Sequence, residues 1–341
     1  MSALTINPLV STIRKYELEK YMNYIVFDLE WNQSSTVSKS NPALPFEIIE
    51  IGAVKLDERG TMIDEFSALI KPSVYKTMHY MTGKLVHIKM AELKNERPFA
   101  EVMEEFLKWC GEDYLFVTWG PLDVTELQRN MVYYGFEPFK NGPLPFYDAQ
   151  KLFALEHDEG KERRSLESAV DMINLEKDIP FHRAFSDAYY TAKVFSSYNK
   201  KETFRHVSYD TFVAPKDKKN ELLIVFDDYE KYISRTFSTK EAMLSDKKVK
   251  DMNCYLCEKP SKKRTKLFSP TGRYCIGVSF CEEHGYIKTK IRIRKNDAGR
   301  YFTVKTKKQI SEKEAKDIQV RYEKSREIKH IKKVRLRGSN S

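Results

Sequence analysis

Short apolar segments alternate with amphipathic segments over the first 200 residues of the chain. Residues 23–29 (NYIVFDL), 47–56 and 62–71 are rich in β-branched and aromatic side chains, which predicts three strands. Residues 57–60 (DERG), between the second and third segments, have the composition of a hairpin turn. We therefore expect neighbouring strands joined by a hairpin near the start of the chain.

The following segments have helical spacing. Residues 98–110 place apolar side chains three and four positions apart, with Pro98 near the start and Gly111 after the end. A short buried strand is expected at 114–119, and further helices are expected at 123–134, 165–173 and 184–198. Hairpin strands followed by alternating helix and strand predict an α/β fold, a mixed sheet covered by helices on both faces.

The chain is long enough for two domains, and its pattern weakens in two places. Residues 1–21 are polar and are interpreted as an N-terminal extension, with Met22 as a hypothetical natural start. Residues 205–250 offer a strand at 222–226 and a helix at 240–245, and are interpreted as a connecting subdomain. The expected divisions are therefore 1–21, a main domain at 22–204, the connecting subdomain at 205–250 and a C-terminal module at 251–341.

The C-terminal part is strongly basic. Residues 285–341 contain 19 Lys and Arg against 6 Asp and Glu, a net charge of +13, whereas the whole chain carries +10. Residues 1–284 therefore carry −3. Cations alternate with Ile291 and Ile293, and a turn at 296–299 precedes a second alternating segment, which predicts a hairpin with one basic face. Such a face fits a polyanionic partner, and the alternative is a solvated charged surface.

A long basic helix is expected to follow this hairpin. Ser311 and Glu314 form a capping-box signature for a helix that runs to about residue 334. If the basic module binds nucleic acid, Tyr286, Tyr301 and Phe302 are candidates for stacking on bases. The alternative is that these rings belong to a core.

Composition narrows the class of protein. Apolar residues make up 41 % of the chain, and 20 Phe with 20 Tyr supply material for a packed core. No apolar run reaches 18 residues, so no membrane span is expected. The N-terminus shows no secretory signal, so the cytoplasm is the expected location.

Four of the five cysteines lie within 28 residues, and this clustering indicates a metal site. Cys254-x2-Cys257 and Cys281-x2-His284 are two ligand pairs of the kind that enclose a structural Zn²⁺. Cys275 is an alternative ligand in place of His284. The non-metal interpretation is a group of reduced thiols. Cys110, alone in a predicted helix, is interpreted as a buried core thiol.

Five other residues form a candidate catalytic set. Asp28 and Glu30 are two positions apart at the end of a strand, so both side chains point to one face. Paired carboxylates repel each other, and a divalent cation with hard oxygen preference, Mg²⁺ or Mn²⁺, would compensate. Asp123 opens a helix, where N-capping is the structural alternative. His182 precedes Asp187 by five residues, which places His182 on a loop and Asp187 in the first turns of a helix.

These motifs resemble the DEDDh exonuclease superfamily. The resemblance is carried by Phe27-Asp28-Leu29-Glu30, by Asp123 and by His182-x4-Asp187, in this order, and it covers about residues 22–200. Residues 50–54 (EIGAV) are similar to the superfamily's second strand, and 81–83 (MTG) to the segment after its third strand. Trp31-Asn32 and residues 118–120 (TWG) resemble the KapD-type and Eri-type branch, which is largely associated with RNA. A match to the family's nucleic-acid anchor after Asp123 is lacking.

The resemblance implies a ribonuclease-H-like fold and hydrolysis of single-stranded RNA or short oligonucleotides from the 3′ end. Two Mg²⁺ or Mn²⁺ ions would clamp the scissile phosphate. Asp28 would bridge both ions, Glu30 and Asp187 would bind on the nucleophile side, and Asp123 would act near the leaving group through water. His182 would be the general base. The alternatives are a DNA 3′→5′ exonuclease for trimming or proofreading, and a nucleic-acid-binding regulator that retains the fold.

Overall fold

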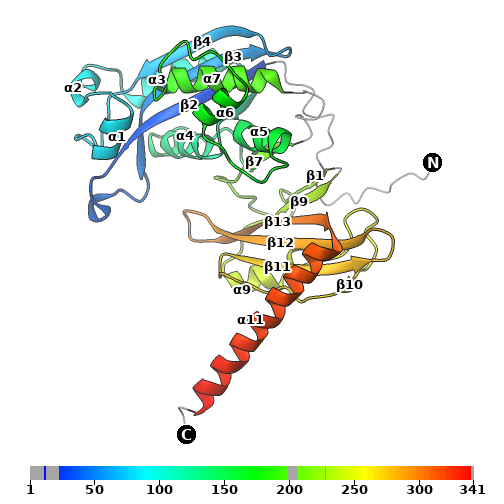
Figure 1. Cartoon of the computed structure of the whole chain (residues 1–341). Helices are drawn as coiled ribbons and strands as arrows, with labels where there is room; N and C mark the ends of the chain where they lie inside the picture. Colours follow the sequence, from blue (N-terminus) through cyan, green and yellow to red (C-terminus); the bar gives the residue numbers. More distant parts are fainter. Residues whose placement is uncertain (1–10, 13–22, 199–205, 227, 339–341) are drawn as a thin grey trace. The chain divides into compact units, whose positions relative to one another are not determined.

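The computed structural model of the chain describes residues 11–12, 23–198, 206–226 and 228–338 (Figure 1). Met22 and most of the expected extension at 1–21 lie outside the described residues. The chain divides into two compact units at residues 213 and 214, and the short strand β1 (Ser11–Thr12) belongs to the second unit. No helix in the described part of the chain is both long and apolar enough to cross a membrane.

The first unit contains a six-stranded mixed sheet with the order β4-β3-β2-β5-β6-β7. Its strands are β2 (Asn23–Gln33), β3 (Phe46–Asp57), β4 (Met62–Leu69), β5 (Tyr114–Thr118), β6 (Leu144–Asp148) and β7 (Ser208–Asp210). The first three strands are antiparallel, β5 and β6 run parallel to β2, and β7 is antiparallel to β6. The predicted early hairpin strands are therefore present, and β2 extends four residues beyond its predicted end.

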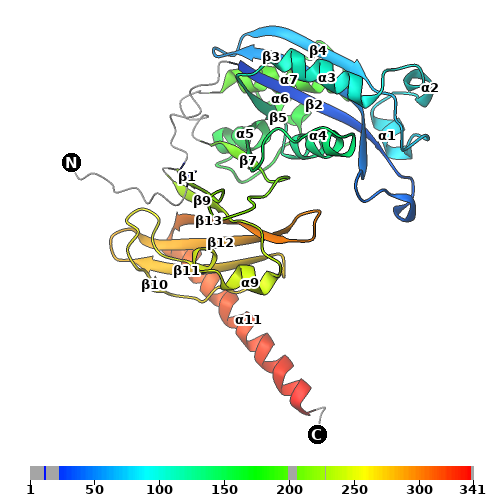
Figure 2. The same cartoon turned by 180° about the vertical axis from the view of Figure 1, so that it is seen from behind.

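Helices cover both faces of this sheet, which confirms the predicted α/β fold class (Figures 1 and 2). The helices are η2 (Val37–Lys39), α1 (Tyr80–Leu85), α2 (Met90–Leu93), α3 (Phe99–Cys110), α4 (Leu122–Tyr133), α5 (Ala149–His157), α6 (Leu166–Met172) and α7 (Ala184–Ser197). One core packs α3 and α4 against the sheet around Phe27 and Phe106. The other core packs α5, α6 and α7 around Tyr147 and Tyr190. Cys110 is buried in the first core, and its burial raises the pKa of the thiol.

The second unit is built on a seven-stranded sheet with the order β1-β8-β9-β13-β12-β11-β10. Its other elements are β8 (Leu222–Val225), β9 (Tyr229–Ile233), α9 (Lys240–Ser245), α10 (Lys247–Lys250), β10 (Lys262–Lys263), β11 (Tyr274–Cys281), β12 (Gly285–Lys295), β13 (Tyr301–Ile310) and α11 (Glu312–Gly338). Strand β9 pairs with β13 of the basic hairpin. Residues 214–250, expected within a separate connecting subdomain, therefore share one sheet with the C-terminal module, whereas β7 belongs to the first unit.

The two faces of the second sheet have different covers. On one face, Met243 of α9 and Val249 of α10 pack against Tyr232, Cys275 and Ile291. On the other face, α11 packs Ala315 and Ile318 against Val278 and Phe268. Figure 1 shows α11 on the near side of this sheet, and Figure 2 shows α9 on the near side of the opposite face.

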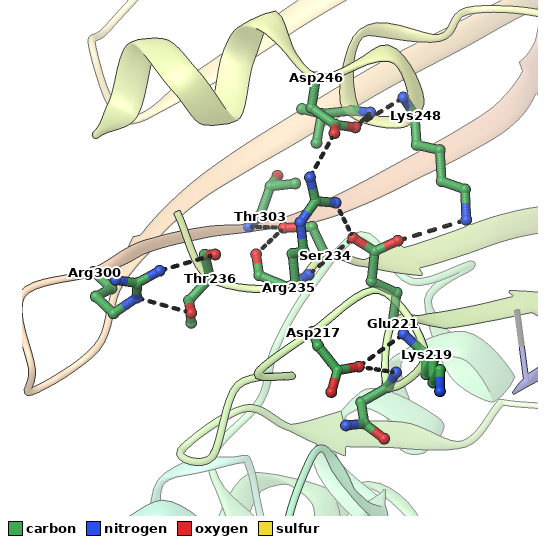
Figure 3. Close-up of polar contacts among 12 residues, drawn as sticks. Asp217, Lys219, Glu221, Ser234, Arg235, Thr236, Asp246, Lys248, Arg300 and Thr303 are labelled. Atoms are coloured by element: carbon green, nitrogen blue, oxygen red, sulfur yellow. Dashed lines mark hydrogen bonds and ion pairs between the residues drawn. The ribbon is translucent and has the colours of Figure 1, made fainter. Parts of the chain in front are cut away.

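An ion-pair network ties α9 and α10 to this sheet (Figure 3). Glu221 is fully buried beside the start of β8, and its carboxylate accepts from Arg235 at 2.6 Å. Arg235 also pairs with Asp246 at 3.0 Å, and Asp246 caps α10 by accepting from the Lys248 amide at 2.9 Å. Burial of these charges is tolerated because each is paired inside the network.

Candidate active site and metal centre

Strand β2 supplies two carboxylates to one side of the first sheet. Asp28 lies opposite Gly52 of β3, and Glu30 lies opposite Glu50, just before an irregularity in pairing at Trp31. Both side chains are half-buried. Because alternate strand residues share a face, the two carboxylates point the same way, as the sequence predicted.

Helix α7 brings a third carboxylate to this pair. Asp187 lies in the first turn of α7, and one carboxylate oxygen from each of Asp28, Glu30 and Asp187 lies within 4.8 Å of the others. The approach depends on Gly52, because a Cβ built there would lie 2.0 Å from the backbone nitrogen of Phe185. The absence of a side chain at residue 52 lets the first turn of α7 rest directly on the sheet.

Asp123 lies beside this group without completing it. It occupies the first turn of α4, is 6 % exposed, and accepts hydrogen bonds from its own backbone amide and that of Leu29. Its charge is second only to burial in raising the pKa of Asp28. Within the described residues, the group of three oxygens inside 4.8 Å does not include Asp123. Its carboxylate therefore stands close enough to interact with Asp28, but outside the tight trio.

The raised pKa values of the site's carboxyl groups indicate that a bound cation would be needed to keep them ionised. Burial, followed by the charges of neighbouring carboxylates, raises the pKa of Asp28 well above its ordinary range and that of Glu30 to about 8. Burial also raises the pKa of Asp123 to about 7, against the opposing effect of backbone amides, and it raises that of Asp187. Clustered carboxylates with hard oxygen donors fit a divalent ion such as Mg²⁺ or Mn²⁺, which would restore their ionised forms.

His182 lies on the loop immediately before α7, as predicted. Its side chain is exposed, and its backbone amide donates to the Asp187 carboxylate at 3.3 Å. Its φ of +68° lies in the left-handed region, which few non-glycine residues adopt. Such conformations cluster at functional sites, where the surrounding structure holds them in place.

An ion pair between the buried Glu50 and the partly exposed Arg183, which the sequence reasoning missed, anchors this loop. Glu50 is 1 % exposed, and Arg183 donates to it through Nε, at 3.1 Å to both oxygens, and through Nη2 at 2.7 Å. The Ala184 amide also donates to Glu50 at 3.3 Å. The available signal was an acidic residue inside the otherwise apolar segment 48–54 together with an arginine next to His182.

Asn32 is a second positioning residue. The sequence indicated it only as part of the Trp31-Asn32 motif, without a structural role. Asn32 is fully buried, and its Nδ2 donates to the carbonyls of Tyr75 at 3.1 Å and Thr77 at 2.9 Å. Its Oδ1 accepts from the His79 amide at 2.8 Å. Asn32 therefore fixes the backbone that leads into α1, which carries the 81–83 motif.

In the second unit, the two predicted ligand pairs come together. Cys254, Cys257, Cys281 and His284 each offer a ligand atom within 4.8 Å of the others. The Sγ atoms of Cys257 and Cys281 are 3.6 Å apart, and His284 Nδ1 lies 3.7 Å from the Sγ atoms of both Cys254 and Cys281. Three sulfurs and one imidazole nitrogen at this mutual spacing fit the tetrahedral shell of Zn²⁺.

Cys275, the alternative ligand, lies elsewhere. It belongs to the apolar cluster with Met243, Val249 and Ile291. It also lies six residues before Cys281 on the continuous strand β11, a separation of about 20 Å along an extended strand. Cys275 and Cys281 therefore cannot contribute to the same ion in this fold.

Comparison with known proteins identifies the first unit. Residues 25–195, half of the chain, match the RNase_T exonuclease family. The chain therefore belongs to this family, and it carries an exonuclease domain of the DEDDh type with a ribonuclease-H-like fold.

Individual relatives match the same part of the chain. The DNA polymerase III subunit epsilon of Aquifex aeolicus (strain VF5) is 28 % identical over 173 residues, which are 50 % of this chain and 78 % of that protein. The DNA polymerase III PolC-type of Lactococcus lactis subsp. lactis (strain IL1403) is 32 % identical over 107 residues, which are 31 % of this chain and 6 % of that protein.

Solved structures with a similar arrangement include cell-death related nuclease 4, with a TM-score of 0.46 and 17 % identity over 60 % of this chain and 68 % of that one. They also include the nuclease domain of 3′hExo bound to rAMP, with a TM-score of 0.47 and 16 % identity over 55 % of this chain and 96 % of that one.

Proposed function

We propose that this chain is a divalent-cation-dependent 3′→5′ exonuclease that hydrolyses single-stranded RNA or short oligonucleotides. The observation that carries the proposal is the meeting of Asp28, Glu30 and Asp187 within 4.8 Å, beside Asp123 and below the loop of His182. A protein that only bound nucleic acid would gain nothing from clustered carboxylates, because they repel phosphate.

In this proposal the four carboxylates hold Mg²⁺ or Mn²⁺. Asp28 would contribute to both of two ions, Glu30 and Asp187 to the ion on the nucleophile side, and Asp123 to the leaving-group side. The ions would supply charge neutralisation at the phosphate and a water of lowered pKa. No bulky side chain separates α7 from the sheet at Gly52, so the donors on β2 and α7 converge on one point.

His182 would act as the general base. Its exposed imidazole can accept the proton of a water that attacks the terminal phosphodiester. The bond between phosphorus and the 3′ oxygen of the preceding nucleotide then breaks, which releases a nucleoside 5′-monophosphate and a shortened strand with a new 3′ hydroxyl. The hydrogen bond from the His182 amide to Asp187 sets the position of this residue relative to the carboxylates.

The first experiment compares 5′-labelled RNA and DNA single strands of one sequence, with free or blocked 3′ ends, in Mg²⁺ and in Mn²⁺. We expect products that shorten stepwise from a free 3′ end, and preferential loss of RNA. Cleavage that ignores a 3′ block would contradict the exonuclease assignment. The matched variants are His182→Ala, expected to bind metal and substrate but lose most of its turnover, and His157→Ala, a histidine outside the carboxylate site. Wild-type turnover by His182→Ala would contradict the base assignment.

DNA as the preferred substrate is the second candidate, and a specific observation favours it. The relative that matches half of the chain is a DNA polymerase III subunit epsilon, and the relative that matches a third of it is a DNA polymerase III PolC-type. The RNA preference is supported instead by the resemblance of Trp31-Asn32 and residues 118–120 to an RNA-associated branch. Faster hydrolysis of the DNA strand in the matched assay would decide for the alternative.

We also infer that Cys254, Cys257, Cys281 and His284 bind one structural Zn²⁺. A closed shell of four protein ligands leaves no open position for substrate, so the ion would stabilise the second unit instead of taking part in hydrolysis. Elemental analysis of anaerobically purified protein should return about one equivalent of zinc, as a four-ligand site implies. Less than half of that amount would contradict the inference.

A further inference from the structure

The second unit presents a row of cations on one face of its sheet. The pairing of β11, β12 and β13 places Lys288, Lys290, Arg292 and Arg294 on one face of the sheet, because they alternate along β12. We name these four residues the basic row. It lies on the same face as α11, whose contacts are with Val278 and its neighbours.

Only one end of the basic row is occupied by an intramolecular partner. Lys288 forms an ion pair with Glu314 of α11. Across the described part of the chain, Lys290, Arg292 and Arg294 form no ion pair with an acidic residue. Lys290 instead lies over the ring of Tyr274, with Nζ 4.7 Å from the ring centroid. Three cations of the row are therefore without an acidic partner in the described part of the chain.

Other cations of the same sheet are treated differently. Lys307, on the opposite face, is 4 % exposed and pairs with Asp251 at 2.6 Å and Glu230 at 3.3 Å. Arg235 is likewise neutralised by Glu221 and Asp246 (Figure 3). Lys307 and Arg235 therefore each have two acidic partners, in contrast to Lys290, Arg292 and Arg294.

Like charges in the row also act on one another. Burial, and then the charges of Arg292 and Lys288, lower the pKa of Lys290, and burial followed by Arg294 lowers that of Arg292. Repulsion of this kind costs stability in the free protein. An anion on this face would relieve it.

The geometry of the row matches an extended polyanion. Alternate residues of a strand are about 6.7 Å apart, so the four cations span about 20 Å in a line. Regular spacing along a line suits successive phosphates better than it suits a single compact anion. An aromatic ring lies beside the line on β11, where Tyr274 is opposite Arg292 and lies against Lys290. Cations interleaved with aromatic rings are the combination found on surfaces that bind single strands.

We propose that Lys290, Arg292 and Arg294 bind the phosphate backbone of a single-stranded nucleic acid. This assigns the second unit a substrate-binding surface of its own, separate from the carboxylate site. The choice of a nucleic acid as the bound anion rests on the proposed function, because the substrate of an exonuclease is a polynucleotide. The row itself contains no catalytic residue.

The test uses the full chain carrying Asp28→Asn, so that the probe is not degraded. In this background we compare the row variant Lys290→Ala/Arg292→Ala/Arg294→Ala with the control Lys240→Ala/Lys247→Ala/Lys250→Ala. The control removes the same charge from α9 and α10, which cover the opposite face. Binding of labelled polyuridylate and polythymidylate is followed by fluorescence anisotropy over a salt series. Zinc content and thermal unfolding verify that each variant is folded.

Loss of three phosphate contacts should lower the slope of log Kd against log salt by about 2, since each contact on a single strand contributes about 0.7. The ratio of the Kd of the row variant to the Kd of the protein with the intact row should consequently fall about twentyfold as salt rises from about 50 to about 200 mM. The control should keep the wild-type slope.

An unchanged slope in the folded row variant would overturn the proposal. So would loss of binding to phosphatidylserine vesicles with no loss of binding to either polynucleotide, because the row would then serve a membrane surface. Failure of the proposed function shows itself separately. If the chain with Asp28 intact hydrolyses no oligonucleotide, the exonuclease assignment fails, and the salt slope still reports on the row.

Discussion

At Gly52, the addition of one methyl group should lower the hydrolytic activity while the protein still folds. An ideal Cβ at this residue would lie 2.0 Å from Phe185 N and 2.1 Å from Ala184 C, both backbone atoms of the first turn of α7. Backbone cannot rotate away as a side chain can. Gly52→Ala must therefore push the start of α7 off the sheet, together with Asp187 two residues further on.

The size of this displacement sets the expected loss. Restoring an ordinary van der Waals contact of about 3.5 Å requires a local shift of about 1.5 Å. Misplacement of a catalytic group by about 1 Å costs about 100-fold in rate, so we expect kcat to fall at least 100-fold. That loss corresponds to about 2.7 kcal/mol of transition-state stabilisation. Overpacking of this kind also costs about 1–3 kcal/mol in the free energy of unfolding.

The assay measures kcat on a labelled single strand and the free energy of unfolding by denaturant for the same preparation. Gly277→Ala is the matched control, because it also adds a methyl group to a strand glycine but meets the flexible end of Met252, at 2.7 Å from Cε. The control should retain wild-type hydrolysis. Wild-type kcat in a folded Gly52→Ala protein would refute the view that close contact at Gly52 positions Asp187.

Three further predictions concern charge and metal. Cys275→Ala should retain about one equivalent of zinc while Cys281→Ala loses it, measured by elemental analysis; retention in both variants would contradict the ligand set. Glu221→Ala should lower the free energy of unfolding by about 3–5 kcal/mol, because it leaves the Arg235 guanidinium, 20 % exposed, without its buried partner; a denaturant series measures this, and a change under 1 kcal/mol would argue against it. In cation-free protein, the raised pKa of Glu30 means that the native state binds more protons than the unfolded chain between about pH 4.5 and 8. Stability should therefore fall as pH rises through that window, and Mg²⁺ should raise the melting temperature more at pH 8 than at pH 6.

The carboxylate set could be predicted because its information is local. Two residues along a strand are enough to put Asp28 and Glu30 on one face. Five residues across a loop and helix start are enough to separate His182 from Asp187. The pairing that joins these two local motifs is not local. It depends on α7 packing against both β2 and β3, with a glycine at the position of β3 where the first turn of α7 meets the sheet.

The ion pair of Glu50 and Arg183 is a second long-range contact that local sequence patterns do not predict. Its partners lie 133 residues apart, and although each stands out locally, nothing in the sequence indicates that they pair with each other. Residues 205–250 show that local patterns also failed to predict part of the fold. Strands β8 and β9 have only four and five residues, too few for a decisive alternation, and β9 finds its place through β13 some 70 residues later. For Cys275, by contrast, local information would have been sufficient to exclude it as a zinc ligand. Its distance from Cys281 along one strand argues against a shared ion as soon as that strand is recognised.

The loop of His182 joins these observations into one physical account of the site. On one side, its backbone amide is bonded to Asp187, and on the other, Arg183 is held by the buried Glu50. His182 is thus an exposed residue in a left-handed conformation, held by a hydrogen bond to Asp187 and by the ion pair of its neighbour Arg183. A free loop would relax that conformation, so the ion pair with β3 offsets its cost. The same strand contributes Gly52, which brings α7 down onto the sheet. Strand β3 supplies none of the proposed metal ligands, yet it determines where Asp187 and His182 stand relative to Asp28 and Glu30.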